Sequence, residues 1–370
     1  MIKKMIIALA VFIGILVLGL LIFLQQPQFG SPPNGTQSAS FVGSPRFTGE
    51  KFENKGGVSV NMSFGQMLKM MPEWLNSNGN KRPAWSIPVV KRNTEEFTST
   101  HDTLTRVTWF GHSAFLLEMD GKKILIDPML GPSPSPVSFI NKRFNDTLPI
   151  TIDNLPDIDA VLFSHDHYDH LDYPSVVQLK EKVGHFYTPL GVGSHLEKWG
   201  VQKDKITQLD WWQEANLEGI KLVLTPAQHF SGRSLGDRDK TLWGSWVIKG
   251  EKDNVFFSGD SGYFDGFKEI GEAYGPFDLC MVECGQYNEL WKEIHMMPEE
   301  TVQAHIDLKG NVLIPIHWGA FNLAFHPWTE SIERAKKAAQ EKNVTVATPQ
   351  IGESYSVNDA IPQKEWWVKK

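Results

Sequence analysis

The chain has 370 residues, of which 41% are hydrophobic and 21% are charged, a composition typical of a globular protein with a sizeable core. The formal net charge of −7 argues against a broad nucleic-acid-binding surface. An acidic body also does not bind anionic lipid by charge alone, so any attachment to a membrane needs another device.

Residues 5–24 provide such a device, because they contain no charged residue and are rich in Ile, Leu and Val. At about 1.5 Å per residue, a helix of this length crosses the roughly 30 Å hydrocarbon core of a bilayer. The alternative is a cleaved signal peptide, whose apolar region is usually about 7–15 residues and ends at a small-residue cleavage site. Residues 21–26 offer no such site. We therefore favour an uncleaved transmembrane anchor over residues 1–26.

Lys3 and Lys4 precede this apolar stretch. The positive-inside tendency then places the N-terminus in the cytoplasm and the body of the protein outside it. Residues 27–48 are rich in Pro, Gly and Ser, which predicts a linker. We assign residues 27–103 as linker and N-terminal extension, with a short helix at 67–75, and residues 104–370 as one large domain.

Strand and helix patterns alternate through this domain. Strands are predicted at residues 107–110, 114–119, 123–127, 158–164, 220–225, 244–249, 254–258, 279–283 and 311–316. Helices are predicted at residues 173–182, 192–199, 299–308 and 329–341. Antiparallel hairpins combined with helices indicate an α/β fold with two sheets packed face to face and covered by helices.

Cys280 and Cys284 lie close together in an apolar segment. A spacing of four residues on a strand separates them by roughly 13 Å, which is too far for a disulfide. We expect two small buried residues instead.

Four metal-ligating side chains follow the predicted strand 158–164 within six positions: His165, His167, Asp169 and His170. Neutral imidazole and carboxylate are good ligands for zinc, and burying so many without a metal is costly. His165 and His167 alternate and can point to one metal, whereas Asp169 and His170 lie past the turn and can reach a second. The alternative, a polar loop with accidental histidines, is disfavoured because the whole chain has only 12 histidines.

Three further candidate ligands, His229, Asp260 and His317, each follow a predicted strand. Taken alone, each is more often an ordinary loop residue. Together with the first four they complete a set of five histidines and two aspartates, which predicts a site for two Zn²⁺ ions. Iron or manganese remains an alternative, because mixed nitrogen and oxygen ligation is not exclusive to zinc.

Other polar residues near these motifs have two interpretations each. His112 and Asp127 either orient a metal ligand or serve in turns and packing. Tyr168 either lines the metal pocket and contacts substrate or simply packs, and Asp172 caps a helix. Arg143 either meets a lipid phosphate or is a solvated loop charge, and we favour the solvated charge.

The motif H-x-H-x-D-H, followed by His, Asp and His at strand ends, resembles the metallo-β-lactamase superfamily. The motifs W-F-G-H at 109–112, L-D-W-W at 209–212 and I-H-W-G at 316–319 are similar to those of N-acyl-phosphatidylethanolamine-hydrolysing phospholipase D. The similarity covers residues 105–355 and is weakest over 286–294. It implies an αβ/βα four-layer sandwich with two zinc ions between the sheets.

The resemblance also implies roles for individual residues. One zinc would be held by His165, His167 and His229, and the other by Asp169, His170 and His317. Asp260 would bridge the two ions, and His295 would lie beside the substrate phosphate. Asp260 and His295 are thus the candidate catalytic residues, and Tyr168 and His295 the candidate substrate-binding residues.

The activity implied by this resemblance is hydrolysis of a phosphodiester in N-acyl-phosphatidylethanolamine or a related phospholipid. The products would be a phosphatidic acid and an N-acylethanolamine. A lactone or amide hydrolase on the same scaffold is the alternative, since a fold alone does not determine the reaction. A non-enzymatic binding module is disfavoured by the full ligand set. A phospholipid and a membrane are the expected partners, and the sequence leaves open whether the chain forms a homodimer.

Overall fold

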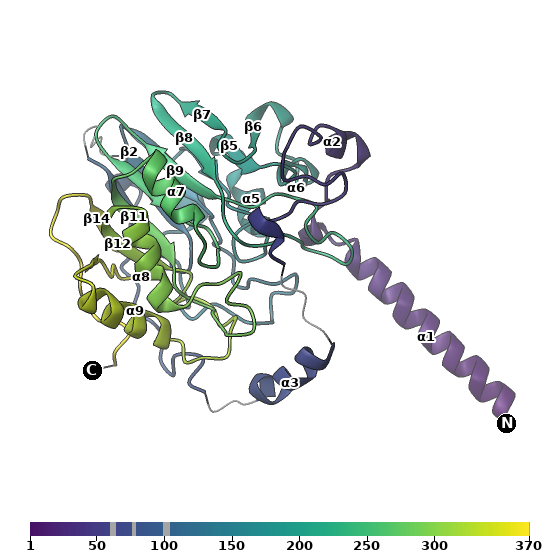
Figure 1. The fold of residues 1–370 in the computed structure, drawn as a ribbon. Coiled ribbons are helices and arrows are strands. Elements are labelled where there is room, and N and C mark those ends of the chain that lie inside the picture. Colours follow the sequence, from purple (N-terminus) through teal and green to yellow (C-terminus); the bar gives the residue numbers. More distant parts are fainter. Residues whose placement is uncertain (60–63, 76–78, 99–103, 370) are drawn as a thin grey trace.

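The computed structural model describes residues 1–59, 64–75, 79–98 and 104–369. The predicted domain boundary at residue 103 falls outside these described residues. Two seven-stranded sheets lie face to face, with helices on their outer faces (Figure 1). The four-layer sandwich expected from the sequence is confirmed.

The first sheet has the strand order β14-β1-β2-β3-β4-β5-β6. Its strands are β1 (Arg106–Trp109), β2 (Phe115–Met119), β3 (Lys122–Ile126), β4 (Ile158–Leu162), β5 (Val183–Pro189), β6 (Ile206–Leu209) and β14 (Ser354–Ser356). Strands β14 to β3 pair antiparallel, and β3 to β6 pair parallel.

The second sheet has the order β13-β12-β11-β10-β9-β8-β7. Its strands are β7 (Glu214–Leu217), β8 (Ile220–Thr225), β9 (Ser245–Lys249), β10 (Asn254–Phe257), β11 (Phe277–Glu283), β12 (Gly310–Ile316) and β13 (Thr345–Val346). Again one half is antiparallel and the other parallel. Each sheet therefore presents the carboxyl ends of several parallel strands at one edge, where ligands collect in such folds.

Helices cover both sheets. The helices α5 (Tyr173–Leu179) and α6 (Gly193–Lys198) pack on the first sheet, and α7 (Gly266–Ala273), α8 (Pro298–Asp307) and α9 (Glu330–Glu341) pack on the second. The largest hydrophobic cluster lies between the sheets and includes Trp109, Trp246 and Trp318. Cys280 and Cys284 are both buried and free, as the sequence predicts.

The N-terminal region differs from its prediction in one respect. Helix α1 (Ile2–Leu24) meets the body of the protein at its C-terminal end, and the rest of the helix projects away from the body (Figure 1). None of its residues is buried. The helix is long and apolar enough to cross a membrane. The segment after it packs on the body instead of forming a free linker, since Phe29, Phe41 and Phe52 are all buried.

The remaining short helices are α2 (Gly35–Ala39), α3 (Phe64–Leu75) and α4 (Glu95–Thr98). The sequence predicts α3 but not α7 or the strands β5, β6, β7, β13 and β14. Several of these are short edge strands, such as β7, whose residues Glu214 and Asn216 are polar and exposed. A hydrophobic pattern is too weak there to distinguish a strand from a loop.

Candidate metal centre

The H-x-H-x-D-H segment forms the loop between β4 and α5. Its far end is held by Asp172, whose carboxylate accepts hydrogen bonds from the amides of Ser175 and Gly131 at 3.0 and 3.1 Å. Asp172 is therefore the N-cap of α5, as predicted. With a strand at one end and a capped helix at the other, the loop presents its imidazoles toward the gap between the sheets.

One group of candidate ligands consists of His165, His167, His229 and Asp260, whose ligand atoms all lie within 4.8 Å of one another. The Nδ1 of His167 lies 2.9 Å from Nε2 of His165 and 3.1 Å from Nε2 of His229. His167 Nδ1 carries at most one proton, so it cannot donate to both neighbours. A cation, in contrast, accepts a lone pair from every nitrogen at once. This convergence is the arrangement that fits a metal ion.

The protonation of these rings also suits metal binding. Burial lowers the pKa of His167 to about 4 and holds the pKa values of His165 and His229 well below the usual range. The three imidazoles are therefore neutral near pH 7, and neutral imidazole is the metal-binding form.

A second group contains Asp169, His170 and His317, with His112 beside them. Burial lowers the pKa of His170, but the carboxylates of Asp260, Asp169 and Asp127 outweigh it and raise that pKa well above its usual value. The local field is thus strongly negative, which favours a cation at this position. The donor set of two imidazoles and one carboxylate is suited to zinc and to other divalent transition metals.

Asp260 lies between the two groups. Its Oδ2 is 3.1 Å from His170 Nε2, and its Oδ1 is 3.0 Å from His317 Nδ1. The same carboxylate is 3.7 Å from His165 Nε2. Gly259 precedes it with φ +57°, and a Cβ there would meet Ser164 at 2.6 Å. Only glycine lets the end of β10 approach the histidine loop this closely.

Residues behind the candidate ligands hold them in place. Asp127 Oδ2 lies 2.7 Å from His170 Nδ1, and His112 Nε2 lies 2.9 Å from Asp169 Oδ2. The orienting contacts that the sequence suggests for His112 and Asp127 are therefore present. His112, Asp127 and His317 all have positive φ angles, of 57°, 40° and 67°. Such backbone strain in non-glycine residues concentrates at functional sites.

His295 lies beside this centre, and its Nδ1 hydrogen-bonds with the carboxyl group of Glu283. Glu283 is fully buried at the end of β11, where its other oxygen accepts a hydrogen bond from the Ser261 amide at 2.6 Å. Burial and the nearby Asp260 raise the pKa of Glu283 well above its usual value. Nδ1 is thereby occupied, which leaves Nε2 as the ring nitrogen available to the pocket. Glu283 cannot be recognised from the sequence, because a lone glutamate at the end of a strand belongs to no motif.

The candidate ligands open into a pocket of about 410 Å³, which we call the metal pocket. His295, His317 and Asp260 lie on its floor. Its walls are mainly apolar and aromatic, with one cation: Met70, Phe230, Trp291, Leu323, Phe325 and Arg238. A polar floor beneath apolar walls suits a ligand with a charged head and hydrocarbon chains.

Two further predictions have different outcomes. Tyr168 is not among the residues lining the metal pocket; its hydroxyl donates to the Arg233 carbonyl at 2.6 Å, and its ring packs near Phe29. The expectation that Arg143 is a solvated charge is wrong. Arg143 is buried and its guanidinium donates to the carbonyls of Phe110 and Met129, because the loops around it leave backbone acceptors that need a donor.

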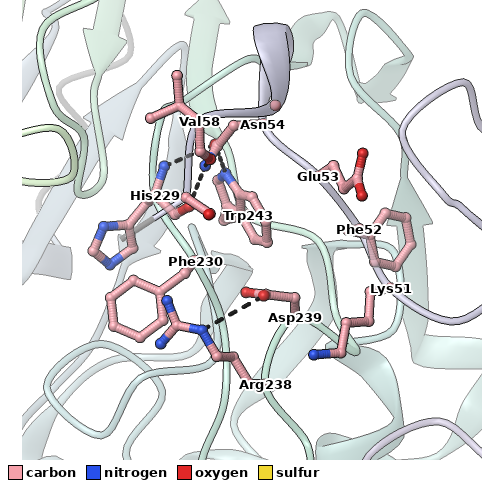
Figure 2. Close-up of a pocket in the computed structure, with 12 residues that line it drawn as sticks. Lys51, Phe52, Glu53, Asn54, Val58, His229, Phe230, Arg238, Asp239 and Trp243 are labelled. Carbon is pink, nitrogen blue, oxygen red and sulfur yellow. Dashed lines mark hydrogen bonds and ion pairs between the residues drawn. The ribbon is translucent and has the colours of Figure 1, made fainter. Parts of the chain in front are cut away.

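The N-terminal extension also reaches the centre. Asn54 Oδ1 accepts hydrogen bonds from the His229 amide at 3.0 Å and the Trp243 indole at 2.9 Å, and its Nδ2 donates to the His229 carbonyl at 2.7 Å (Figure 2). These contacts surround a small pocket of about 170 Å³ that Arg238 and Phe230 also line. A segment more than 170 residues away in sequence thus holds the backbone of a candidate ligand.

A family model described as the β-lactamase superfamily domain matches residues 122–318, more than half of the chain. The chain belongs to the metallo-β-lactamase superfamily. It is a metal-dependent hydrolase of that superfamily, with the His and Asp clusters described above.

Two relatives extend this result. A Mycobacterium tuberculosis protein of uncharacterized function is 40% identical over 329 residues, covering 88% of this chain and 87% of the relative. The Caenorhabditis elegans N-acyl-phosphatidylethanolamine-hydrolyzing phospholipase D 1 is 30% identical over 292 residues, covering 74% of this chain and 81% of the relative.

The fold is also shared with a solved structure. The metallo hydrolase Igni18 from Ignicoccus hospitalis superposes with a TM-score of 0.54 at 24% identity, over 70% of this chain and all of that protein. This likeness concerns the fold alone. Membership of the superfamily indicates metal-dependent hydrolysis. The residues that line the pocket indicate the class of substrate.

Proposed function

We propose that this protein is a dinuclear zinc phosphodiesterase that hydrolyses N-acyl-phosphatidylethanolamine or a related phospholipid, in the manner of a phospholipase D, while anchored to a membrane by α1. The observation that carries the proposal is the metal pocket, which combines candidate metal ligands and His295 on its floor with apolar walls. The relation to the nematode phospholipase supports the same substrate class.

In this proposal His165, His167 and His229 would hold one zinc ion and Asp169, His170 and His317 the other, and Asp260, which lies between the two groups, would be a further ligand. Two such ions would lower the pKa of a shared water and polarise the phosphoryl oxygens of the substrate. The centre is buried between the sheets and surrounded by strands and caps, so its donors are already arranged before a substrate binds.

The chain's own residues supply the remaining functions. His295 presents Nε2 to the pocket, where it donates a hydrogen bond to the phosphate or a proton to the departing alkoxide of the N-acylethanolamine. Glu283 fixes the ring through Nδ1. Arg238 adds a positive charge to a wall that receives an anionic phosphodiester.

The test is product analysis by mass spectrometry after incubation of zinc-loaded protein with N-acyl-phosphatidylethanolamine in mixed micelles. We expect phosphatidic acid and N-acylethanolamine in equal amounts, together with turnover of bis-p-nitrophenyl phosphate. Release of free fatty acid would assign amide or ester hydrolysis instead. Turnover of a lactone without turnover of either phosphodiester would favour the alternative activity and contradict the proposal.

A further inference from the structure

A second pocket, of about 520 Å³, lies where α1 meets the body, and we call it the entry pocket. One side is formed by the last turns of α1, through Leu20, Phe23 and Leu24. The other side is formed by the loop of residues 230–238 and by Tyr168. A 23-residue helix is about 34 Å long, so an α1 that crosses the roughly 30 Å hydrocarbon core has its last turns near the membrane surface. The entry pocket would then open at that surface.

Arg233 links the segment directly after α1 to the loop that carries the candidate metal ligands. Arg233, which is buried, donates to the Gln28 carbonyl at 2.7 Å and also to the carbonyls of Asp166 and Leu171. The indole of Trp199 donates to the Pro27 carbonyl at 2.7 Å. The residues directly after α1 are therefore joined to the body by hydrogen bonds.

Large apolar side chains lie exposed around the entry pocket. Leu235, in the 230–238 loop, is 75% exposed, and Phe139 is 74% exposed with Ile140 beside it. Phe139 and Ile140 follow Pro136 in the sequence, and Pro136 lines the entry pocket. Exposed apolar residues gathered next to a membrane helix mark a surface that enters the interfacial region of the bilayer.

The entry pocket and the metal pocket share a wall. Phe230 and Arg238 line both, and the Arg238 guanidinium lies 4.2 Å from the centre of the Phe230 ring. Phe230 also packs against the ring of His167, with centroids 4.5 Å apart. An aromatic ring and a cation thus separate an apolar pocket from a metal centre, which matches the boundary between the chains and the phosphate of a phospholipid.

We propose that the entry pocket takes an acyl chain of a phospholipid from the membrane that holds α1, and that the phosphate of this lipid passes Arg238 to reach the metal pocket. This inference rests on the proposed function and adds to it the source of the substrate and its route. Leu235, Phe139 and Ile140 form the surface that contacts the bilayer. The protein therefore hydrolyses lipid of its own membrane in preference to lipid of other vesicles.

The test uses the full chain in phosphatidylcholine vesicles that contain N-acyl-phosphatidylethanolamine and a phosphatidylcholine with a diazirine in one acyl chain. After illumination, peptide mapping should find the label on residues 230–238. Two variants alter this surface. Ser234→Trp fills the entry pocket, and Leu235→Glu places a charge at its exposed rim. Ile306→Glu is the matched control, since Ile306 is 40% exposed on α8.

We expect both variants, and not the control, to lose labelling of residues 230–238. The ratio of vesicle-lipid turnover to bis-p-nitrophenyl phosphate turnover should fall about tenfold, the effect of losing roughly two buried methylene groups. No labelling of this loop in the parent protein, or equal labelling and equal ratios in all four proteins, would overturn the inference. Labelling that the variants abolish, in a protein that hydrolyses no phosphodiester, would uphold the lipid surface and contradict the proposed function.

Discussion

The metal pocket and the entry pocket adjoin each other but are built in different ways. Most candidate ligands in the first are held by a buried polar group behind them, as with Asp127 behind His170. The second is formed by apolar side chains of α1 facing a loop with both apolar and polar residues, and its apolar member Leu235 is 75% exposed. A metal centre needs side chains that are held in fixed positions, because the geometry of metal ligands tolerates little error. Lipid binding tolerates the second, because burial of hydrocarbon is non-directional.

This difference predicts that substitutions in the metal pocket reduce turnover of every substrate, whereas substitutions at the entry pocket reduce turnover only of lipid in a bilayer.

Asp260→Asn should lose both metal and activity. Asparagine keeps the shape of the side chain but removes the negative charge that lies between the two groups of ligands. The loss should exceed the roughly 10–100-fold that results when a neighbour of a ligand is changed. Elemental analysis and bis-p-nitrophenyl phosphate kinetics measure the two effects. A variant that keeps full metal content would show that Asp260 is not a ligand.

His295→Ala should keep its metal and lose activity. If His295 is the general acid, the rate falls by roughly 10²–10⁴-fold, and if it only positions phosphate, the loss is smaller and mainly in KM. His185→Ala is the control, since His185 lies on β5 and hydrogen-bonds with Thr207. Loss of metal from the His295 variant would make this residue a ligand and contradict its assigned role.

Asp127→Asn should have an intermediate effect. The carboxylate of Asp127 lies 2.7 Å from His170 Nδ1, which orients the ring, and it accepts a hydrogen bond from the Ser164 amide. The variant should therefore lose roughly 10–100-fold in metal affinity or activity. Asp159→Asn, at a partly exposed ion pair with Lys122, provides the control. Competition with a chromogenic chelator measures the affinity. An unchanged affinity and rate would mean that the histidine loop holds its own geometry.

Deletion of residues 1–26 should have the smallest effect on the metal centre. All seven candidate ligands lie beyond residue 164, and α1 has no buried residue. We expect a soluble protein that retains its metal and its turnover of bis-p-nitrophenyl phosphate, while turnover of lipid in vesicles falls by more than in the entry-pocket variants, because the anchor and one side of the entry pocket are both lost. A monodisperse product without metal would show that α1 supports the centre as well as the membrane contact.

The same contrast explains what could be predicted from the sequence. The candidate ligands could be picked out because H-x-H-x-D-H is local and because His229, Asp260 and His317 each follow a recognisable strand, and the fold brings these residues together. The sequence indicates that Asp127 and His112 are candidates for orienting a ligand. It does not indicate which ligands they contact, since their partners, His170 and Asp169, are distant in sequence. The two sheets followed from their hydrophobic strands, whereas polar edge strands such as β7 did not.

Other features depend on contacts that no local pattern encodes. Glu283 closes an ordinary buried strand, and only the fold brings it to His295. Residues 27–48 have the composition of a linker, yet Phe29 and Phe41 pack on the body, as does Phe52 just beyond them. A composition rich in Pro, Gly and Ser indicates that the isolated segment has no stable structure. In the folded protein, packing of its aromatic side chains on the body gives the segment a defined position. Arg143 is buried for a similar reason, because backbone carbonyls of distant loops surround it.

The central claim, that this pocket is a two-metal phosphodiesterase centre, is tested most directly by titrating chelator-treated protein with Zn²⁺ while following hydrolysis of bis-p-nitrophenyl phosphate. We predict that activity is absent without metal, rises with added zinc and reaches its plateau at about two equivalents per chain, in agreement with the bound zinc measured by elemental analysis. Activity that persists without metal, or bound zinc at two equivalents with no phosphodiester hydrolysis, would contradict the account.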